Sequence, residues 1–447
     1  MIEKILDKAK KEFDSVEVAE LKRTDTTVGF QANVLKSMKT TERLGYALRA
    51  VKDGKIAFTS SSKPDDVDGI IERAKVTLKY SPTAEMEFAK SENYPKPVIT
   101  DPKIKQLDAA SMIKMSGDAV DSLCDLHKNV KIMSGVSTDN VTMRIMTSNG
   151  FDGSYEKDDM SVGAGAILTD GDNFLQVGHG LIGSSYVGGG FNDLISTVRK
   201  YFTWGLKNVP IESGKHQVLF APDAVNDILG IIQASVNGTS VFKKVSPFGD
   251  KVGQQVMDSR VSIFDDSTVD GLPSSMPFDD EGTPSQRTPI VENGVLKGFI
   301  ADRTVAKKLG ITPTGNGFRA SGKFSSTSEI EAPVSTATSN MIIEPGKKNS
   351  DDILAGIKNG VLVVALMGSM MGNPLTGTLA GNIGLGFVIK DGQVTGRIKN
   401  AMLSVNLFEV LKDSVVDISS DTYVTSSWAR DINVPYMLLD NCVVAAK

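Results

Sequence analysis

Apolar residues recur along this chain with two spacings, one typical of helices and the other typical of strands. The opening segment MIEKILDKAKKEFDS has the helical spacing. Its apolar face consists of Ile2, Ile5, Leu6, Ala9 and Phe13. Strand-like alternation follows in VEVAELKR and TVGFQANVLKSM. The segments LGYALRAV and IAFTSSS flank an Asp-Gly pair, which supplies the backbone conformation of a tight hairpin turn. The sequence therefore predicts a helix followed by a small sheet.

Later segments continue this mixture of helices and hairpins. Further helices are predicted at residues 64–80, 106–127, 192–205, 223–238 and 302–309. Hairpin turns are indicated at residues 149–150, 170–171, 293–294 and 391–392. Residues 81–101 are rich in Pro, Glu and Lys, show little periodicity and are expected to form a connecting segment. Because helices and strands do not alternate in regular β-α-β order, the fold class is α+β and not a doubly wound sheet.

A passage containing Pro and Gly between residues 205 and 215 indicates a domain boundary. We expect an N-terminal α+β domain, a sheet plus helices, over residues 1–208. A C-terminal domain over residues 209–447 is expected to be strand-rich, because its sequence is dense in glycine and in hairpin signals. At 447 residues the chain is long enough to bury a substantial core in each domain.

Charge and composition exclude several classes of protein. The net charge is −5 and the basic residues are spread along the sequence, so no surface for direct nucleic-acid binding is indicated. Cys124 and Cys442 form neither a disulfide framework nor a Cys-x-x-Cys site, as expected in a reducing compartment. The opening helix is not a signal peptide, and no apolar run reaches the roughly 18 residues of a membrane span. We therefore expect a soluble, cytoplasmic protein.

Two polar segments in the second half are candidate sites. Asp279, Asp280 and Glu281 lie beside a glycine-containing turn, and such carboxylates can bind a hard cation. The alternating ligand positions of a calcium or magnesium loop are absent, so a solvated or backbone-capping turn is the favoured interpretation. Residues 312–317, Thr-Pro-Thr-Gly-Asn-Gly, form an irregular loop. Such a loop either lines a site or makes a structural crossover, and both remain open.

Nucleotide binding and nucleophilic hydrolysis find little support. The glycine-rich run at residues 372–386 lacks the Gly-Lys-Ser/Thr ending of a P-loop, and its glycines are expected to let a strand curve or approach another backbone closely. No Gly-x-Ser-x-Gly motif occurs, and the three histidines are far apart. Only His179, between two glycines, has the loop setting that suits catalysis. A lone loop histidine is more often structural.

One long block has a more specific signature than these short motifs. It comprises PFDDEGTP, VENGVLKGFI and GITPTGNGFR, preceded by Gly253-Gln254-Gln255-Val256 and, near the N-terminus, by LGYALRAVKDGKIAFTSS. These segments resemble the TldD/PmbA family, also called TldD/TldE or modulators of DNA gyrase, over nearly the whole chain. The resemblance implies an α+β N-terminal domain, a strand-rich C-terminal domain and assembly into a dimeric cytosolic peptidase that cleaves peptides or unfolded segments. Candidate cavity-lining residues in the block are Asp279, Asp280, Glu281, Thr314, Asn316 and Arg319.

The resemblance also implies a zinc site that this chain lacks. In the TldD branch a His-Glu-x-x-x-His element and a later Cys bind zinc, and the Glu acts as general base. Histidines five apart converge only if the helix is widened or broken. Aligned with GIIQASVNGTSV, the pattern places Gln233 and Gly238 at the two His positions and Ala234 at the Glu position, and residues 413–431 contain no Cys. Gln and Gly cannot replace imidazoles, and Ala cannot accept a proton.

The chain therefore resembles the TldE/PmbA branch. The resemblance implies a non-catalytic subunit, without metal or cofactor of its own, that pairs with a zinc-bearing TldD-like subunit. It would complete the cavity and help bind peptide or unfolded polypeptide, for instance by strand addition. The alternative is a stand-alone homo-oligomeric peptide-binding or chaperone-like protein, a homodimer when isolated. A third hypothesis is a metal-independent hydrolase whose catalytic groups the sequence does not identify; its test is activity in chelator that is lost in His179→Ala. The sequence gives no support to a direct link with gyrase.

Overall fold

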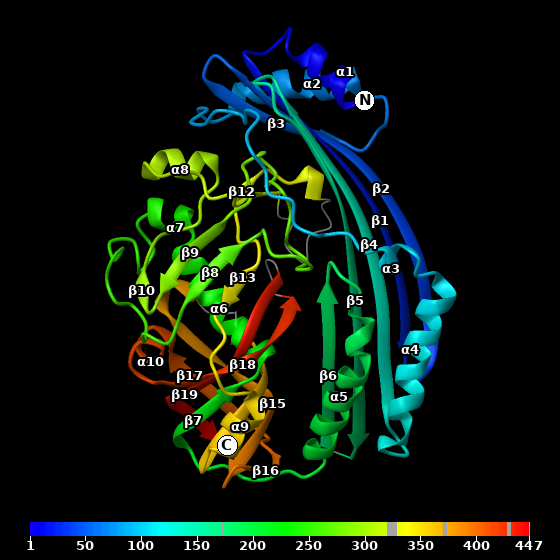
Figure 1. Ribbon diagram of the computed structural model, residues 1–447, viewed down its shortest axis with the longest axis vertical. Coiled ribbons are helices and arrows are strands. Elements are labelled where there is room, and N and C mark those ends of the chain that lie inside the picture. Colours follow the sequence, from blue (N-terminus) through cyan, green and yellow to red (C-terminus); the bar gives the residue numbers. More distant parts are fainter. Residues whose placement is uncertain (172, 320–328, 370–372, 427–430, 447) are drawn as a thin grey trace.

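The computed structural model describes residues 1–171, 173–319, 329–369, 373–426 and 431–446 (Figure 1). Its first half is built on a six-stranded sheet in the order β3-β2-β1-β4-β5-β6, in which every neighbouring pair is antiparallel. The strands are β1 (Ser15–Gln31), β2 (Val34–Lys52), β3 (Lys55–Ser61), β4 (Lys131–Thr147), β5 (Asp152–Asp170) and β6 (Asn173–Gly183). We call this the N-terminal sheet.

Helices pack against the N-terminal sheet in two groups. These helices are α1 (Ile2–Ala9), α2 (Val67–Thr77), α3 (Pro102–Lys105), α4 (Ala109–Leu123) and α5 (Phe191–Gly205), with 3-10 turns η1 (Leu78–Tyr80), η2 (Cys124–Leu126) and η3 (Val187–Gly190). The apolar faces of α1 and α2 share one core with β1 and β2, whereas α4 and α5 share another with β4, β5 and β6. As predicted, residues 84–101 contain no helix or strand.

The second half of the described chain forms an eleven-stranded sheet, which we call the second sheet, and a short two-stranded one (β11, β12). Its main path runs β10-β9-β8-β13-β19-β17-β15-β14-β7, with β16 beside β15 and β18 beside β19. The strands are β7 (Gly214–Phe220), β8 (Ile263–Asp266), β9 (Arg287–Glu292), β10 (Val295–Leu296), β11 (Gly317–Phe318), β12 (Ser335–Thr336), β13 (Met341–Ile343), β14 (Asn359–Met367), β15 (Thr378–Lys390), β16 (Gln393–Arg397), β17 (Ala401–Asn406), β18 (Val415–Ser426) and β19 (Asp431–Ala446). The helices are α6 (Pro222–Val236), α7 (Gly238–Phe242), α8 (Arg303–Leu309), α9 (Ser350–Ala355) and α10 (Leu407–Asp413), with η4 (Glu329–Glu331) and η6 (Pro374–Thr376).

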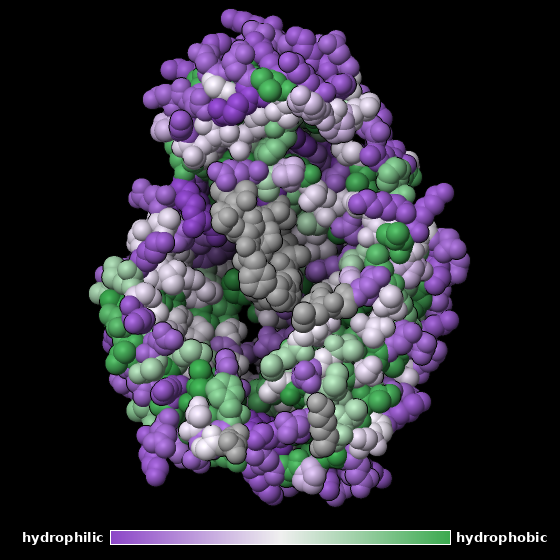
Figure 2. All heavy atoms as spheres, turned by 180° about the vertical axis from the view of Figure 1, so that it is seen from behind, coloured by the Kyte–Doolittle hydropathy of each residue, from purple (hydrophilic) through white to green (hydrophobic). Residues whose placement is uncertain are grey.

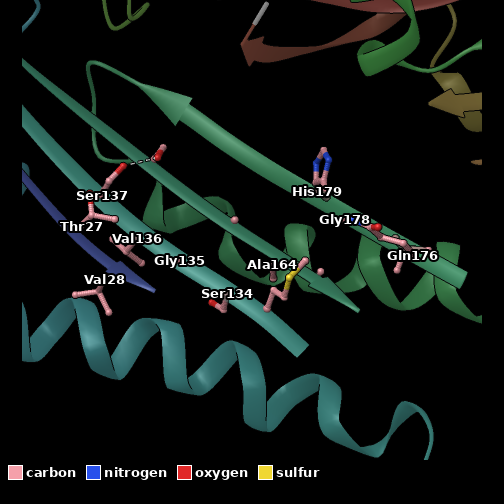
Figure 3. Close-up of a pocket in the computed structure, with 15 residues that line it drawn as sticks. Thr27, Val28, Ser134, Gly135, Val136, Ser137, Ala164, Gln176, Gly178 and His179 are labelled. Carbon is pink, nitrogen blue, oxygen red and sulfur yellow. Dashed lines mark hydrogen bonds between the residues drawn. The ribbon is translucent and has the colours of Figure 1, made fainter. Parts of the chain in front are cut away.

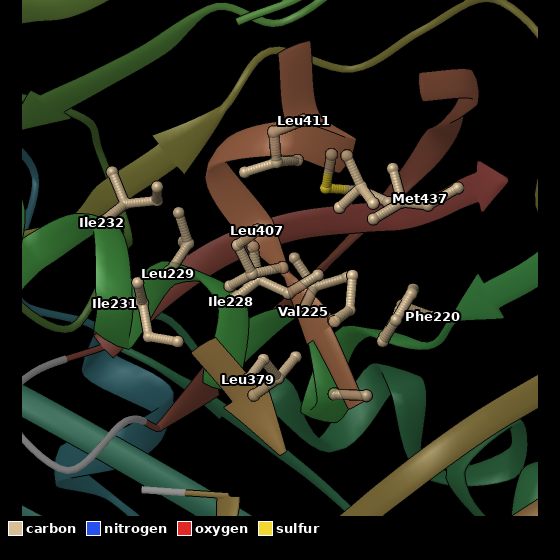
Figure 4. Packing of buried hydrophobic residues seen from close by; sticks show 14 of the residues in the cluster. Phe220, Val225, Ile228, Leu229, Ile231, Ile232, Leu379, Leu407, Leu411 and Met437 are labelled. Atoms are coloured by element: carbon tan, nitrogen blue, oxygen red, sulfur yellow. The ribbon is translucent and has the colours of Figure 1, made fainter. Parts of the chain in front are cut away.

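Helix α6 anchors the core of the second half. Its apolar side chains pack against those of β7, β15, β19 and α10, as Figure 4 shows for Ile228, Leu229, Leu379, Leu407 and Met437. Each such side chain contributes roughly 1.5–3 kcal/mol by leaving water. This packing fixes the rotation of α6 about its axis. Seen from behind, the molecule is hollowed near its middle (Figure 2).

The structure confirms the α+β fold class and most predicted elements. The helix predicted at residues 302–309 is α8, with Asp302 accepting the N–H of Val305 at its start and Gly310 in the left-handed conformation at its end. The glycine-rich run contributes to β15, where a Cβ at Gly386 would lie 3.1 Å from the carbonyl oxygen of Leu362, so close backbone approach is confirmed. Residue 372, the first of that run, lies outside the described residues.

One prediction is wrong. His179 does not lie in a loop but within strand β6, opposite Ala164 of β5. The flanking glycines are not crowded: a Cβ at Gly178 would lie 3.7 Å from the carbonyl oxygen of Ala164, and one at Gly180 would lie 3.5 Å from that of Val162. Both glycines belong to a regular strand and do not mark a turn.

The boundary between residues 208 and 209 stays a prediction. Strand β6 ends at Gly183, α5 ends at Gly205, and the second sheet begins at Gly214. No helix among the described residues combines the length and apolar character needed to cross a membrane.

Candidate functional site

The least buried face of α6 carries the residues of greatest chemical interest. Helical spacing of three and four places six partly buried or exposed positions on this face, while the remaining side chains point into the core. We call the six the α6 stripe: Asp223, Asn226, Asp227, Gly230, Gln233 and Ala234. The two positions aligned with the first His and the Glu of the zinc motif, 233 and 234, therefore lie on the same face as two carboxylates.

The helix is broken where the zinc motif would need it to be. Helix α6 ends at Val236, and Asn237 adopts an extended conformation with φ −68° and ψ 121°. Its side chain then accepts the N–H of Thr239 and starts α7. The break lies between Gln233 and Gly238. The backbone thus retains a geometry that could bring together two side chains five positions apart, although the ligands are missing.

The residues present at this break do not fit a zinc ion. A Cβ on Gly238 would lie 2.7 Å from the carbonyl oxygen of Ile300 and 2.8 Å from Cγ1 of Val305, so the site has no room for an imidazole. Gln233 offers an amide whose Nε2 is buried without a hydrogen-bond partner. Ala234 offers a methyl group. Among the described residues no three His, Cys, Asp or Glu side chains converge in a way that could hold a metal.

The C-terminal cysteine does not supply the missing thiolate. Cys442 is buried in β19, where it lies opposite His216 of β7. Burial and the charge of Asp440 raise the pKa of its thiol to about 12. The ring of His216 in turn bonds the backbone carbonyl of Glu212. Both residues have structural roles in the second sheet.

The acidic turn at residues 279–281 caps backbone groups. The carboxylate of Asp279 accepts N–H bonds from Glu281 at 3.0 Å, Thr283 at 2.8 Å and Gly317 at 2.8 Å. All three acidic side chains are buried, so the backbone-capping interpretation is correct and the solvated one is wrong. Burial and the charge of Glu281 raise the pKa of Asp279 to about 8.

Buried ion pairs join this turn to the N-terminal sheet. Arg49 of β2 contacts Glu17 of β1 at 2.5 Å and Glu281 at 2.6 Å, while Arg319 contacts Glu17 at 3.1 Å. We call Glu17, Arg49, Glu281 and Arg319 the ion network. Burial acts against the charge of Arg49, yet the two carboxylates raise its pKa. Sequence analysis singled out Glu281 and Arg319 but not their partners on β1 and β2, which lie more than 200 residues away.

The other two candidate cavity-lining residues are held by internal hydrogen bonds. The hydroxyl of Thr314 donates to the side-chain oxygen of Asn316 at 2.6 Å, and the amide nitrogen of Asn316 donates to Asp265 at 2.7 Å. Asn316 is buried. These contacts favour the structural-crossover interpretation of the loop. That the six candidate residues line a substrate cavity stays a prediction.

Sequence reasoning missed a pocket at the N-terminal end of the α6 stripe. It encloses about 20 Å³ between β6, α5, α6, β18 and β19. The polar lining residues are His179, Thr197, Tyr201, Asp223, Tyr423 and Tyr436. No local motif links these residues, which are spread over more than 250 positions. The three tyrosines carry no sequence signal that distinguishes them from ordinary core aromatics.

Aromatic contacts and one carboxylate organise this pocket, which we call the tyrosine pocket. The rings of His179 and Tyr423 are 6.0 Å apart in an edge-to-face arrangement, and the hydroxyls of Tyr201 and Tyr436 share a 3.2 Å hydrogen bond. Thr425 donates to one oxygen of Asp223 at 2.9 Å. Burial lowers the pKa of His179, against the opposing charge of Asp223. The imidazole is therefore neutral near pH 7.

His179 also borders a shallow trough of about 460 Å³ on the N-terminal sheet. The trough runs across β1, β4, β5 and β6, where Gly135 and Gly178 leave the backbone uncovered. Figure 3 shows the imidazole of His179 projecting from β6 away from β4 and α4. His179 also lines the tyrosine pocket.

Comparison with known proteins places this architecture in a family. A sequence model described as the PmbA/TldA metallopeptidase C-terminal domain matches residues 213–446, and one described as PmbA/TldA metallopeptidase domain 1 matches residues 16–77. The chain belongs to the PmbA/TldD family. An uncharacterized protein of Methanocaldococcus jannaschii is 28% identical over 424 residues, which are 93% of this chain and 94% of that protein.

Relatives that are described as metalloproteases match a shorter region. One from Methanocaldococcus jannaschii is 32% identical over 213 residues, but the match covers 46% of this chain and 44% of the metalloprotease. A metalloprotease TldD homolog of Buchnera aphidicola is 31% identical over 175 residues, covering 39% of this chain and 33% of the homolog. This chain thus matches less than half the length of these metalloproteases.

Solved structures show the same fold over the whole chain. TldE from Thermococcus kodakarensis superposes with a TM-score of 0.90 at 21% identity, covering 99% of both chains. A Thermotoga maritima protein described as a modulator of a DNA gyrase superposes with a TM-score of 0.87 at 22% identity, again covering 99% of both. These similarities concern the fold alone.

Proposed function

We propose that this chain is a cytoplasmic, non-catalytic, TldE-like subunit of a TldD/TldE-type metallopeptidase. It pairs with a metal-bearing relative and helps to bind peptide or unfolded polypeptide. Membership of the PmbA/TldD family supports the peptidase context. The observation that carries the non-catalytic role is the packing of Gly238, where a side chain would collide with the Ile300 carbonyl.

A TldE-like role also fits the α6 stripe. Gln233 and Ala234 can neither bind zinc nor move a proton. In this proposal the chemistry takes place on the partner, which supplies the zinc and the general base. This chain supplies surface and hydrogen-bonding groups.

The test is reconstitution with a relative from the same genome that carries the His-Glu-x-x-x-His motif. Each chain is purified alone and then mixed, and mass is followed by light scattering, zinc by elemental analysis and cleavage with denatured casein. We expect a hetero-oligomer that cleaves casein, with zinc held only by the relative. As a control, the relative with its motif Glu replaced by Gln should still assemble but should not cleave.

Three outcomes contradict the proposal. Stoichiometric zinc in this chain alone, with cleavage that a chelator abolishes, would make it an enzyme in its own right. Self-association with no binding to the relative would instead support the stand-alone peptide-binding protein. Cleavage that persists in chelator and is lost in His179→Ala would indicate the metal-independent hydrolase.

A further inference from the structure

The tyrosine pocket has the size of one small polar group. A cavity of about 20 Å³ exceeds the roughly 10–15 Å³ that one water molecule needs. A primary ammonium group is similar in size to water, whereas a trimethylammonium group is several times larger. Tyr201 is buried at the inner wall, and the exposed Asp223 lies on the solvent side. The pocket can therefore receive the end of a chain that enters past Asp223.

The lining of the pocket favours a cation. Among the described residues that line it there is no Lys or Arg, and Asp223 is the only acidic one. Aromatic rings attract cations to their faces, and Tyr423 and Tyr436 lie 5.9 Å apart at 79°, so they present differently oriented surfaces. Tyrosine hydroxyl oxygens can also accept N–H bonds. An anion in the pocket would lie beside the acidic side chain of Asp223, with no Lys or Arg among the described lining residues to bind it.

The acidic residues around the pocket add to the negative charge of Asp223. Burial is the largest cause that raises the pKa values of Tyr201, Tyr423 and Tyr436, and the acidic residues that add to it are Asp193, Asp223, Asp351 and Asp421. Of these, Asp351 is paired with Lys200 at 3.0 Å. Asp227, one helical turn from Asp223 on the α6 stripe, adds a further carboxyl group. A negative potential from several carboxylates concentrates cations at such a cleft.

We propose that the tyrosine pocket binds the primary ammonium group of a peptide, either its α-amino terminus or a lysine side chain. The proposal rests on the proposed function, because it identifies the part of a peptide substrate that this subunit holds. Asp223 balances the charge, and the tyrosine rings and hydroxyls surround the ammonium group. The neutral imidazole of His179 tolerates the cation beside it.

The experiment uses the full chain and four synthetic tetrapeptide amides. The first has a free α-amino group and no lysine. The second is N-acetylated and carries one lysine, the third carries trimethyllysine in its place, and the fourth is N-acetylated with no lysine. Affinities come from calorimetry. The pKa of His179 comes from its imidazole NMR signals, with His127 and His216 as internal references.

We expect the first or the second peptide to bind at least about tenfold more tightly than the fourth, equivalent to about 1.4 kcal/mol. Whichever of the two binds identifies the source of the ammonium group. The trimethyllysine peptide should bind no better than the fourth. Binding of the cation should also lower the pKa of His179, because a nearby positive charge disfavours the imidazolium ion.

Asp223→Asn separates this role from a structural one. The asparagine keeps the oxygen that accepts the Thr425 hydrogen bond, so folding should be preserved while the charge is lost. The variant should lose the discrimination between ammonium and acetylated peptides. Asp121→Asn, an exposed position on α4, is the matched control and should keep it.

Equal binding of all four peptides, no binding of any, or unchanged discrimination in Asp223→Asn would each overturn the pocket assignment. These results are independent of whether this chain assembles with a metal-bearing relative. Assembly without ammonium discrimination would refute only the pocket, and discrimination without assembly would refute only the subunit role.

Discussion

The surroundings of Gly238 leave no room for a side chain at this position. The backbone nitrogen of Gly238 donates to the Ile300 carbonyl at 2.9 Å, and a Cβ would approach that same oxygen to 2.7 Å. Real Cβ atoms do not approach backbone atoms so closely, so α7 or the Ile300 segment would have to move. The packing around Gly238 therefore leaves no room for a metal-binding side chain, or for most other side chains, at this position.

Gly238→Ala is therefore expected to lower the free energy of unfolding by about 1–3 kcal/mol, the usual cost of overpacking. Gly249→Ala is the control, because its Cβ would meet other atoms no closer than 3.6 Å. Urea unfolding followed by circular dichroism measures both. The triple variant Gln233→His, Ala234→Glu, Gly238→His should not acquire stoichiometric zinc. Zinc binding by the folded triple variant would contradict our account of the packing.

The carboxyl group of Asp227 should make stability depend on pH. Burial and the charge of Asp223 raise its pKa from 3.8 to about 6, despite a hydrogen bond from Ser369. Between about pH 4 and pH 6 the folded protein binds more protons at this group than the unfolded chain does. Its contribution to the free energy of unfolding therefore falls as pH rises through this range.

Asp227→Asn should remove this dependence. Relative to wild type, the variant should gain about 1–3 kcal/mol in the free energy of unfolding between pH 4 and pH 7, from a pKa shift of roughly two units. Asp121→Asn, on the exposed face of α4, should give no such change. A stability difference between Asp227→Asn and wild type that is the same at both pH values would show that the carboxyl group is not perturbed by folding.

Two hairpin turns have the same local sequence signal, an Asx-Gly pair, but different surroundings in the folded protein. The turns Asp53-Gly54 and Asn293-Gly294 both have positive φ at both residues, as the Asx-Gly pairs predicted. The turn at Gly54 is open to solvent. A Cβ on Gly294 would lie 2.1 Å from the Met257 carbonyl oxygen, because residues 253–258 fold over that turn.

The pair Gly54→Ala and Gly294→Ala isolates this difference. Both variants carry the cost of a left-handed alanine, about 1–2 kcal/mol. Gly294→Ala adds the clash with the Met257 segment and should lose about 1–3 kcal/mol more. Chemical denaturation of the two variants measures the difference directly. Equal losses would mean that the segment over β9 and β10 moves aside without cost.

At the scale of the whole molecule, the ion network joins the N-terminal sheet to the second half of the chain. Arg49 holds Glu17 on its own sheet and Glu281 in the acidic turn, and these side chains are all buried. Buried pairs need not stabilise a protein more than apolar residues would. Removing one member, however, leaves carboxylates buried without their partner.

Arg49→Met is expected to cost about 3–5 kcal/mol of the free energy of unfolding. Arg144→Met is the control on the same sheet, since Arg144 pairs with Glu3 and Asp152 at the surface and should cost about 1 kcal/mol or less. Thermal and chemical unfolding of both variants provide the measurement. A cost for Arg49→Met no larger than that of the control would show that the network does not hold the two halves together.

Local sequence was enough to predict elements whose causes are local. The start of α8 at Asp302, its end at Gly310 and the Asx-Gly turns depend on groups within a few residues, so the pattern identified them. The Gly-His-Gly segment misled the same reasoning. Its glycines lie within strand β6 and pair with strand β5, and the local pattern does not reveal that pairing.

The sequence by itself determined which groups stand at the three positions aligned with the zinc motif: Gln233, Ala234 and Gly238 carry neither an imidazole nor a proton acceptor. It also determined the α+β class through the periodicity of its apolar residues. Only the tertiary structure decided which distant groups meet. It brings Arg49 to Glu281, and His179 to Asp223 and Tyr423, because burial and charge act through space and not along the chain.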